Sequence, residues 1–556
     1  MDFACSAGSV EYCAVGTTER ASFTEGMLSG DDDSGGHSKN TPNGTHTPKR
    51  AKFRGFSIIL FQYGRAHGGR NVDTSCPIPL TQNGVLLPKH AQRTLWGASN
   101  SLSHLGMWPR GSVRLRIAFF TTAMSRPATP PQLDTLVIHA DQPDHIREPA
   151  YAVAPSISVS TTFHQPHPDS ELAHTGHGEP HPEDAFHIYS RYSQDTRVRS
   201  ERVISGMMKG HALLYSSGLS AADAIADLLL PTTIAIRRGY FGVHGVFQKY
   251  AQGRNVKFID LDDEYPTQEG TPSQEDYDVR RGATLVWLET PLNPTGEARD
   301  IEHYAQRAHA AHAYLAVDAT LAPPPLQHPF QHGADFVMHS GTKYFGGHSD
   351  LLVGIAATQN YKQFVALWKE RSISGRVPGS LETFLLLRSL RTMPLRVRHQ
   401  SATATNLVQF LHSLTEGQLP AEHVPDDIAH GRFVKQVWHS SLQPRPAYPE
   451  EVADTQKENH AFDPKTQLPM GGSPTFGLLT AHADYAKYLP HFLSYFVPAT
   501  SLGGVESLIE QRVIASPDTD PRLIRISVGL EDSKDLRSDL LQAMLATLQH
   551  VRSQSQ

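Results

Sequence analysis

The residues with the clearest chemical potential lie in one short stretch, residues 339–350, which reads HSGTKYFGGHSD. Its single lysine, Lys343, stands among hydroxyl residues and glycines. A lysine amine can form a Schiff base, and the hydroxyls of Ser340 and Thr342 can hydrogen-bond phosphate oxygens. Glycines let the backbone approach a bulky planar ligand, because they have no Cβ. The stretch therefore predicts a site for a carbonyl cofactor that carries a phosphate.

Two other interpretations fit the same twelve residues. Lys343 is also compatible with a lysine on a surface turn. The spacing Ser340-x-x-Lys343 occurs in serine acyl-enzymes, in which the lysine acts as the base. The companion Ser-Asp-Asn and Lys-Thr-Gly elements of those enzymes are absent, since Ser349-Asp350 is followed by Leu351.

Composition limits the class of protein. The chain has 556 residues, a net charge of -6 and three cysteines, Cys5, Cys13 and Cys76. The length exceeds one usual domain, and the mild charge does not favour a nucleic acid or a membrane surface as partner. Because all the cysteines precede Met124, we expect no disulfide framework and no cysteine-based metal site after it. No apolar run reaches the length of a membrane span, so we expect a cytoplasmic protein.

The first part of the chain has the composition of an extension. Residues 1–50 are rich in Ser, Gly, Thr and Asp, which predicts disorder, and residues 51–123 are basic without sustained periodicity. A mitochondrial presequence is one interpretation, but the acidic residues near the start disfavour it. We expect residues 1–123 to be a disordered or irregular extension, with Met124 a plausible true start.

Folded sequence is expected from about residue 133. Residues 124–190 are interpreted as an N-terminal arm, and their histidine-rich part, 164–187, fits no standard set of metal ligands and is expected to be a solvated loop. We expect a large domain at 191–385 and a smaller C-terminal domain at 386–556. A polar, proline-containing insertion is expected at about 417–470.

After the arm, short apolar runs alternate with helical patterns. This order predicts a mainly parallel sheet covered by helices. The predicted strands are 212–215, 232–236, 256–261, 284–288, 314–317 and 336–338, and the predicted helices between them include 219–230 and 301–313. Ligands of such sheets bind beyond the carboxyl ends of the strands, which is where Ser217-Gly218, Asp318 and Lys343 fall. A glycine turn that opens a helix, as at Gly218, is also a ready anion site.

The sequence pattern in the last third of the chain predicts a second, α+β unit. A long helical pattern runs through Leu385 and Arg398, and strand-like segments follow at 475–479 and 523–528. A final helix is expected at 533–552. In the second of these strands, polar and apolar positions alternate around Arg525, which predicts a guanidinium aimed out of the smaller domain toward a cleft.

Other candidate residues gain a role only beside Lys343. Asp318 ends an apolar strand and alone would suggest a helix cap or turn. Next to a Schiff-base lysine, it could keep the ring nitrogen of pyridoxal phosphate protonated. Tyr240 could stack on the ring or belong to the core. Tyr189 and Arg191, two residues apart, suit a phosphate but are equally at home on a surface.

Together these pieces resemble the pyridoxal-phosphate enzymes of cysteine and methionine metabolism, which include cystathionine γ-synthase, cystathionine γ-lyase and cystathionine β-lyase. The resemblance runs from about residue 133 to the C-terminus. Its motifs are Tyr189-Ser190-Arg191, Ser216-Ser217-Gly218, ETPLNPT at 289–295, Val317-Asp318, the Lys343 stretch, Ser501-Leu502-Gly503-Gly504 and RISVGLE at 525–531.

The resemblance implies a fold, an assembly and roles. It implies pyridoxal-phosphate fold type I, an α/β architecture with a mainly parallel seven-stranded sheet and a smaller C-terminal α+β domain. It also implies a homotetramer, a dimer of dimers, in which a neighbouring subunit completes each site. The implied catalytic residues are Lys343 and Tyr240. The implied cofactor-binding residues are Lys343, Asp318, Gly218, Leu219, Ser340, Thr342, Tyr189, Arg191, Tyr240 and Asn293, with Tyr189 and Arg191 coming from the neighbour. The implied ligands of the substrate carboxylate are Ser501 and Arg525.

The chain also departs from the family pattern, which leaves its substrate open. The Asn that usually follows the ring aspartate is Ala319, and the acid that often precedes the carboxylate-binding serine in γ-acting members is Thr500. The resemblance implies a transsulfuration enzyme that acts on cystathionine, cysteine or an activated homoserine ester, as a synthase or as a C–S lyase. An aminotransferase, or an inactive structural member with the same fold, is the alternative.

Overall fold

The computed structural model describes residues 130–141, 153–175, 179–267, 273–274, 278–420, 424–443 and 462–554. The chain divides into two units, Met1–Pro130 and Pro131–Gln556, and every element below belongs to the second. The predicted extension at 1–123 lies outside the described residues, as do parts of the predicted arm and of the insertion at 417–470.

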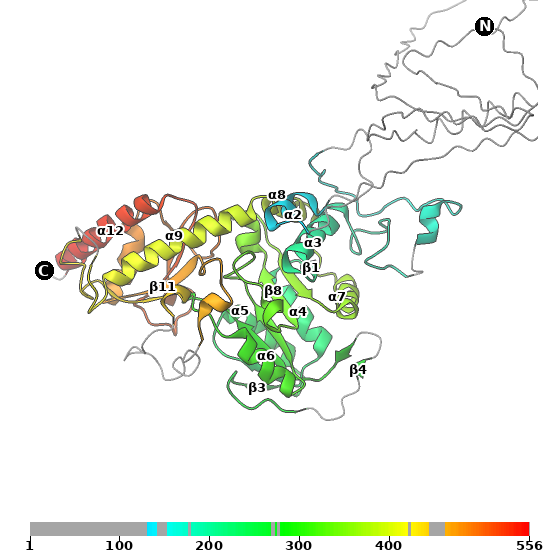
Figure 1. The fold of residues 1–556 in the computed structure, drawn as a ribbon, viewed down its shortest axis with the longest axis horizontal. Helices are drawn as coiled ribbons and strands as arrows, with labels where there is room; N and C mark the ends of the chain where they lie inside the picture. Colours follow the sequence, from blue (N-terminus) through cyan, green and yellow to red (C-terminus); the bar gives the residue numbers. More distant parts are fainter. Residues whose placement is uncertain are drawn as a thin grey trace, which may run out of the picture. The chain divides into compact units, whose positions relative to one another are not determined.

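A seven-stranded sheet forms the centre of this unit (Figure 1). Its strand order is β1-β9-β8-β7-β6-β2-β3. Every neighbouring pair is parallel except those of β9, which runs antiparallel to both β1 and β8. The strands are β1 (His211–Tyr215), β2 (Thr233–Ile236), β3 (Lys257–Ile259), β6 (Leu285–Glu289), β7 (Tyr314–Asp318), β8 (Phe336–Ser340) and β9 (Gly354–Thr358). The prediction of a mainly parallel, seven-stranded sheet is confirmed.

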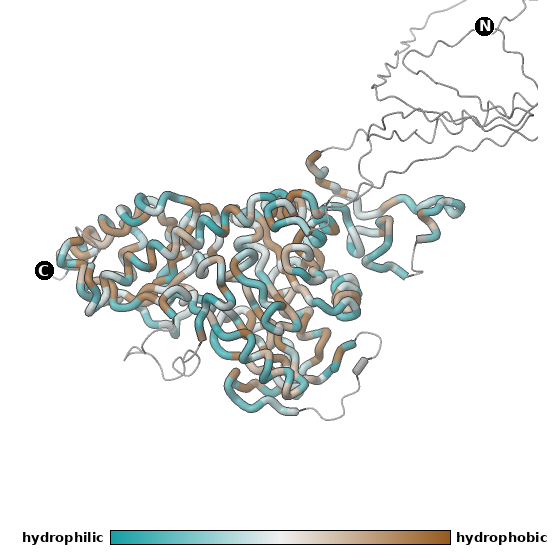
Figure 2. Tube along the Cα trace, in the orientation of Figure 1, coloured by the Kyte–Doolittle hydropathy of each residue, from teal (hydrophilic) through white to brown (hydrophobic). Residues whose placement is uncertain are grey.

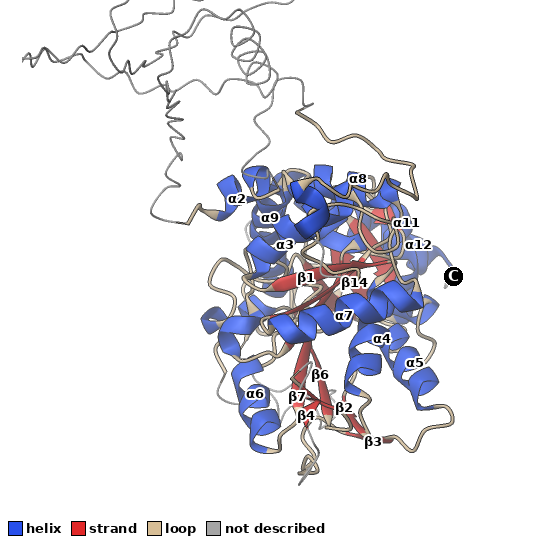
Figure 3. Cartoon of the chain, turned by 90° about the vertical axis from the view of Figure 1, so that its right-hand side faces the viewer, coloured by secondary structure: helices blue, strands red, loops and turns tan. Residues whose placement is uncertain are grey.

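Helices cover both faces of this sheet. One hydrophobic cluster joins the sheet to α4, α5 and α7, and a second joins its other face to α3, α6 and α8. Figure 3 shows α6 on one side of β6 and β7, with α4 and α5 on the other. Because both faces are covered, β6, β7 and β9 are buried along their whole length, as expected for a sheet in the middle of three layers. These helices are α3 (Asp195–Met208), α4 (Gly218–Leu229), α5 (Phe241–Ala251), α6 (Ile301–Ala310), α7 (Tyr361–Ser374) and α8 (Ser380–Leu390).

A second sheet lies in the C-terminal part, in the order β10-β11-β14-β13-β12. It packs with α9, α11 and α12 around a hydrophobic cluster of its own. Amphipathic helices such as these alternate between teal and brown in Figure 2. The elements are α9 (Met393–Ser413), β10 (Val434–Trp438), β11 (Thr475–Thr480), α11 (Ala483–Phe492), β12 (Val497–Pro498), β13 (Leu508–Gln511), β14 (Leu523–Ser527) and α12 (Ser533–Gln554).

Several local expectations differ from the structure. The helical pattern through 385–398 is two helices, because α8 ends at Leu390 and Pro394 stands in the first turn of α9, where a missing N–H costs no hydrogen bond. Strands β9, β10, β12 and β13 were not predicted, and β10 lies within the segment that was expected to be an insertion. A short helix, α2 (Leu133–His139), forms within the predicted arm.

No helix within the described ranges is both long and apolar enough to cross a bilayer.

Candidate active site

The predicted site residues meet at one edge of the central sheet. Asp318 is the last residue of β7, and it pairs in register with Glu289, the last residue of β6. Lys343 follows β8 by three residues, and Gly218 opens α4 after β1. Since β1, β6, β7 and β8 all point the same way, their carboxyl ends place these groups together.

Lys343 lies in a single helical turn, η3 (Thr342–Gly346), in which its own backbone leaves helical geometry at φ -82° and ψ -121°. Its Nζ lies 2.6 Å from the Ser501 hydroxyl. Burial, and then the nearby positive charge of Arg525, lower the pKa of Lys343 to about 8. The amine is thus much closer to its neutral, nucleophilic form at neutral pH than an ordinary lysine amine is.

Ser501 reaches Lys343 from the C-terminal part of the chain. Its φ is +85°, a conformation that residues with a side chain seldom adopt and that commonly marks a functional position. Gly503, two residues later, packs against the backbone between Lys343 and Tyr344, where a Cβ would come within 2.8 Å of the Tyr344 nitrogen. Glycine is therefore required for this loop to close over Lys343.

Asp318 is buried, and Thr320 orients it. The Thr320 N–H and hydroxyl both donate to Asp318 Oδ1, at 3.0 and 2.6 Å. The Thr320 hydroxyl oxygen also accepts from the Ser340 N–H at 2.8 Å, so it joins the ends of β7 and β8. Within the described residues, both hydrogen bonds to the Asp318 side chain go to Oδ1, which leaves Oδ2 without a donor. Thr320 was not among the predicted residues, although its place two residues after Asp318 is a usable signal, because such a hydroxyl reaches back to its neighbours.

Glu289 is a second buried carboxylate beside Asp318. Burial raises the pKa of both groups, and the negative charge of Asp318 raises the pKa of Glu289 further. Two like charges so close are costly to ionise together in a dry interior. In the sequence, Glu289 stands at the start of the ETPLNPT motif, and no role was predicted for it.

The beginning of α4 forms a cradle with Ser340. Ser217 caps this helix by accepting from the Ser220 N–H at 3.1 Å. A Cβ on Gly218 would lie 3.1 Å from Ser340 Cβ, so the first turn of α4 packs closely against Ser340. The Thr342 hydroxyl instead bonds to the backbone of Val353, at 3.0 and 3.3 Å. A phosphate role for Thr342 stays a prediction.

Arg525 lies deep in the structure. All five residues of β14 are buried, so the alternation predicted from its sequence does not separate a core face from an open one. One guanidinium nitrogen donates to Asn293 Oδ1 at 3.2 Å, and the other donates to the Ser501 carbonyl oxygen and to Glu510, both at 2.8 Å. Glu510 also pairs with Arg512 at 2.5 Å. Burial, followed by the charge of Arg512, lowers the pKa of Arg525 to about 10.

The aromatic and basic residues predicted to bind the cofactor lie in two separate places, Tyr240 in one and Tyr189 and Arg191 in the other. Tyr240 is 41% exposed and caps the start of α5, where its backbone N–H donates to Glu289. Arg191 instead donates to the Ser372 carbonyl oxygen at the end of α7, and its guanidinium lies 4.6 Å from the ring of Tyr192. Tyr189, at 40% exposure, pairs by a β-bridge with Thr162. The contacts of Tyr189 and Arg191 within one chain therefore lie away from Lys343.

The comparison with protein families covers most of this unit. Residues 134–545 match the family model described as Cys/Met metabolism PLP-dependent enzyme. The chain belongs to this family. A cystathionine gamma-lyase of Dictyostelium discoideum is 32% identical over 427 residues, which cover 74% of this chain and 97% of the relative. A cystathionine beta-lyase of Coxiella burnetii is 29% identical over 431 residues, which cover 74% and 97%.

Solved structures agree with this membership. A methionine gamma lyase from Micromonospora echinospora, solved in its apo form, superposes with a TM-score of 0.57 at 30% identity, covering 74% of this chain and 99% of that one. The structure described as metB from Corynebacterium glutamicum gives a TM-score of 0.59 at 25% identity, covering 75% and 98%. As a member of this family, the chain is a pyridoxal-phosphate enzyme of transsulfuration chemistry.

The residues at the sheet edge suit pyridoxal phosphate. Lys343 offers an amine with a lowered pKa to its aldehyde. Asp318 keeps one carboxylate oxygen for a ring N–H, since Thr320 takes the other. The start of α4 presents free N–H groups, for which a phosphate is the matching ligand.

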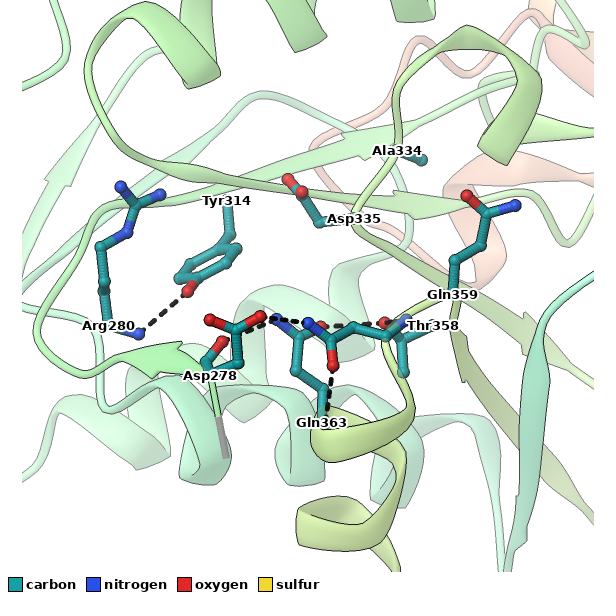
Figure 4. Close-up of a pocket in the computed structure, with 9 residues that line it drawn as sticks. Asp278, Arg280, Tyr314, Ala334, Asp335, Thr358, Gln359 and Gln363 are labelled. Carbon is teal, nitrogen blue, oxygen red and sulfur yellow. Dashed lines mark hydrogen bonds between the residues drawn. The ribbon is translucent and has the colours of Figure 1, made fainter. Parts of the chain in front are cut away.

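A separate cavity of about 410 Å³ lies at the opposite edge of the sheet (Figure 4). It is lined by the first residue of β7, by residues just before β8 and by the end of β9, among them Tyr314, Asp335 and Thr358. Most of its polar groups bond to one another, as Thr358 does to Gln363 at 2.9 Å. It contains none of the family motifs, so its volume does not make it the candidate active site. Groups of three side chains able to hold a metal are likewise absent from the described residues, the described part of 164–187 included.

Proposed function

We propose that this pyridoxal-phosphate enzyme is a cystathionine C–S lyase. The observation that carries the proposal is the meeting of an amine of lowered pKa, Lys343, with a buried carboxylate, Asp318, and a buried guanidinium, Arg525. These are the groups needed to hold the cofactor, activate its ring and bind an amino-acid carboxylate. Relatives named as cystathionine γ- and β-lyases support the choice of a lyase over a synthase.

The roles of the residues follow from their positions. Lys343 would hold the cofactor, and Asp318 would keep its ring nitrogen protonated. Gly218, Leu219, Ser340 and Thr342 would bind its phosphate. Tyr240 would stack on the ring, with Asn293 near the phenolic oxygen. Ser501 and Arg525 would bind the substrate carboxylate.

When bound, pyridoxal phosphate supplies an electron sink conjugated to the substrate α-carbon. Lys343 Nζ, once released from the cofactor, would take the proton from Cα and return a proton later. Ser501 Oγ, within 2.6 Å of Nζ, would hold the amine over that carbon. Arg525 would fix the carboxylate, and so determine which bond of Cα faces the Lys343 amine. The bond that breaks joins sulfur to Cβ or Cγ, and the sulfur leaves as a thiol.

Product analysis with cystathionine tests the proposal. Cleavage at Cγ yields cysteine, 2-oxobutanoate and ammonia, whereas cleavage at Cβ yields homocysteine, pyruvate and ammonia. Thr500, in the place of the acid common in γ-acting members, favours cleavage at Cβ. Lys343→Ala should abolish either reaction and keep the fold. Cystathionine formation from cysteine and an activated homoserine ester, without cleavage, would show a synthase instead.

We also propose that the chain works in the cytoplasm as a homotetramer. Several apolar side chains are exposed in a single chain, among them Leu352, Ile373 and Leu395. Ile373 follows Ser372, which Arg191 contacts. An interface there would cover this apolar surface and bring Tyr189 and Arg191 to a neighbouring site. The mass of the protein in solution, measured by light scattering, tests this assembly.

A further inference from the structure

Glu289 binds two loops at once. Its Oε2 accepts from the Tyr240 N–H and its Oε1 from the Asn293 N–H, both at 2.7 Å. The side chain is 4% exposed and lies at the end of β6, next to Asp318. One carboxylate therefore fixes the backbone of two residues in different loops, Tyr240 in the loop after β2 and Asn293 in the loop after β6.

The approach of the first loop to this carboxylate is unusually close. Gly239, which precedes Tyr240, has a φ of +93°, and a Cβ there would lie 2.4 Å from Glu289 Oε2. Any larger residue would strain the backbone and displace the carboxylate oxygen. The positions of Gly239 and Glu289 are thus matched to each other.

An ionisable carboxyl group is energetically unfavourable at the buried position of Glu289. Burial and the neighbouring Asp318 both disfavour a charged Glu289. A glutamine of the same size would avoid that cost, but its amide has only one acceptor oxygen, and its NH₂ would meet an N–H group. Only a carboxyl group of this length can accept from both loops.

We infer that Glu289 is a positioning residue, which sets Tyr240 and Asn293 in their places against the cofactor through their backbones. The inference rests on the proposed roles of Tyr240 and Asn293. Asn293 also accepts from Arg525, at 3.2 Å, so Glu289 fixes one of the supports of the substrate-binding guanidinium as well.

Two variants test this from the two sides of the contact. Glu289→Gln removes one of the two acceptors without a change of size, and Gly239→Ala pushes Oε2 away from the Tyr240 N–H. We expect each to weaken pyridoxal phosphate binding to the cofactor-free protein by about tenfold, since one of the two buried hydrogen bonds that hold the loops is lost. At saturating cofactor, we also expect the visible circular dichroism per bound cofactor to change, because the ring environment differs. Gly253→Ala is the matched control, since its φ is +73° and no atom lies within 4 Å of the added Cβ.

The outcomes separate the inference from the proposed function. If wild-type protein does not bind pyridoxal phosphate, the proposed function itself fails. If it binds, and Glu289→Gln keeps both wild-type affinity and wild-type circular dichroism, Glu289 does not position the site. A lower melting temperature with an unchanged dichroism at saturation would also overturn the inference, because it would show a purely structural role.

Discussion

Lys343 is buried near the positive charge of Arg525, and this environment determines the pH at which its amine becomes reactive. The neutral amine is the nucleophile, and it predominates above a pKa of about 8 rather than above the ordinary lysine value. The rate at which cofactor-free protein forms the imine with pyridoxal phosphate should therefore rise with pH and level off above about pH 8. Stopped-flow absorbance across pH 6 to 10.5 measures this. A rate that keeps rising to pH 10 would show an ordinary lysine.

Arg525 should govern substrate affinity rather than cofactor affinity. Its guanidinium contacts Ser501 and Asn293, and we propose that it binds the substrate carboxylate. Arg525→Ala should raise KM for an amino-acid substrate about a hundredfold, because a buried charged contact is lost. Arg525→Lys should rescue it only in part, since the fork is lost.

Arg512→Ala is the matched control for Arg525. Arg512 pairs with the same Glu510 but has no recorded contact with Ser501 or Asn293 in the described residues. It should change KM far less. Cofactor absorbance after dialysis should stay as in wild type for Arg525→Ala, and a variant that loses cofactor but binds substrate normally would place Arg525 at the wrong end of the site.

At the scale of elements, the sequence predicted the strands of the central sheet where their apolar pattern was strong. Strands β6, β7 and β8 are apolar except at their carboxyl ends, as strands buried on both faces are, and each was predicted to within two residues. Strand β9 reads GIAAT, and its glycine and alanines have low strand propensity, so tertiary pairing with β1 and β8 defines it.

The candidate site was predicted only in part, because some of its contacts depend on tertiary structure rather than on a local sequence pattern. Lys343 and Asp318 follow apolar strands, so their location at the sheet edge follows from strand direction. The contacts of Glu289 and Glu510 depend on how segments far apart in the chain meet, and no local sequence pattern predicts this. Glu510 is 15 residues from Arg525 along the chain, and the two meet only because β13 and β14 pair.

The short helix α2 is held by one buried carboxylate. Asp141 is fully buried and accepts from Arg199 and Arg391, both at 2.7 Å. Asp141→Ala removes the buried carboxylate that Arg199 and Arg391 share, and should lower the free energy of unfolding by about 3 kcal/mol. Asp134→Ala is the control, because its pair with Arg398 is exposed and should contribute under about 1 kcal/mol. Urea unfolding compares the two, and equal effects would contradict the assignment.

The same carboxylate predicts a pH dependence. Burial opposes ionisation of Asp141, but the hydrogen bonds from Arg391 and Arg199 outweigh it and hold its pKa below the ordinary value. A carboxylate with a lowered pKa stabilises the fold above its unfolded pKa of about 4, and this contribution is lost as pH falls through the folded value. The stability difference between wild type and Asp141→Ala should accordingly shrink on acidification below pH 4.

At the scale of the whole molecule, residues 1–123 should be dispensable. They carry no motif residue, and the family match begins at residue 134. A chain that starts at Met124 should keep wild-type cofactor binding and turnover, with a melting temperature within a few degrees of wild type. Absorbance of the bound cofactor and the rate of product formation measure this. Loss of either would make the basic stretch at 51–123 part of the folded protein.

The proposed sharing of sites between subunits can be tested by mixing two inactive variants. Lys343→Ala removes the amine of one chain, and Arg191→Ala removes the phosphate ligand that the neighbouring chain would supply. Each alone should be nearly inactive. In a mixed dimer, one site receives both defects and the other receives neither, so co-expression should restore about a quarter of wild-type activity. If Lys343 and Arg191 served the same chain's site, every site would carry one defect and the mixture would stay inactive.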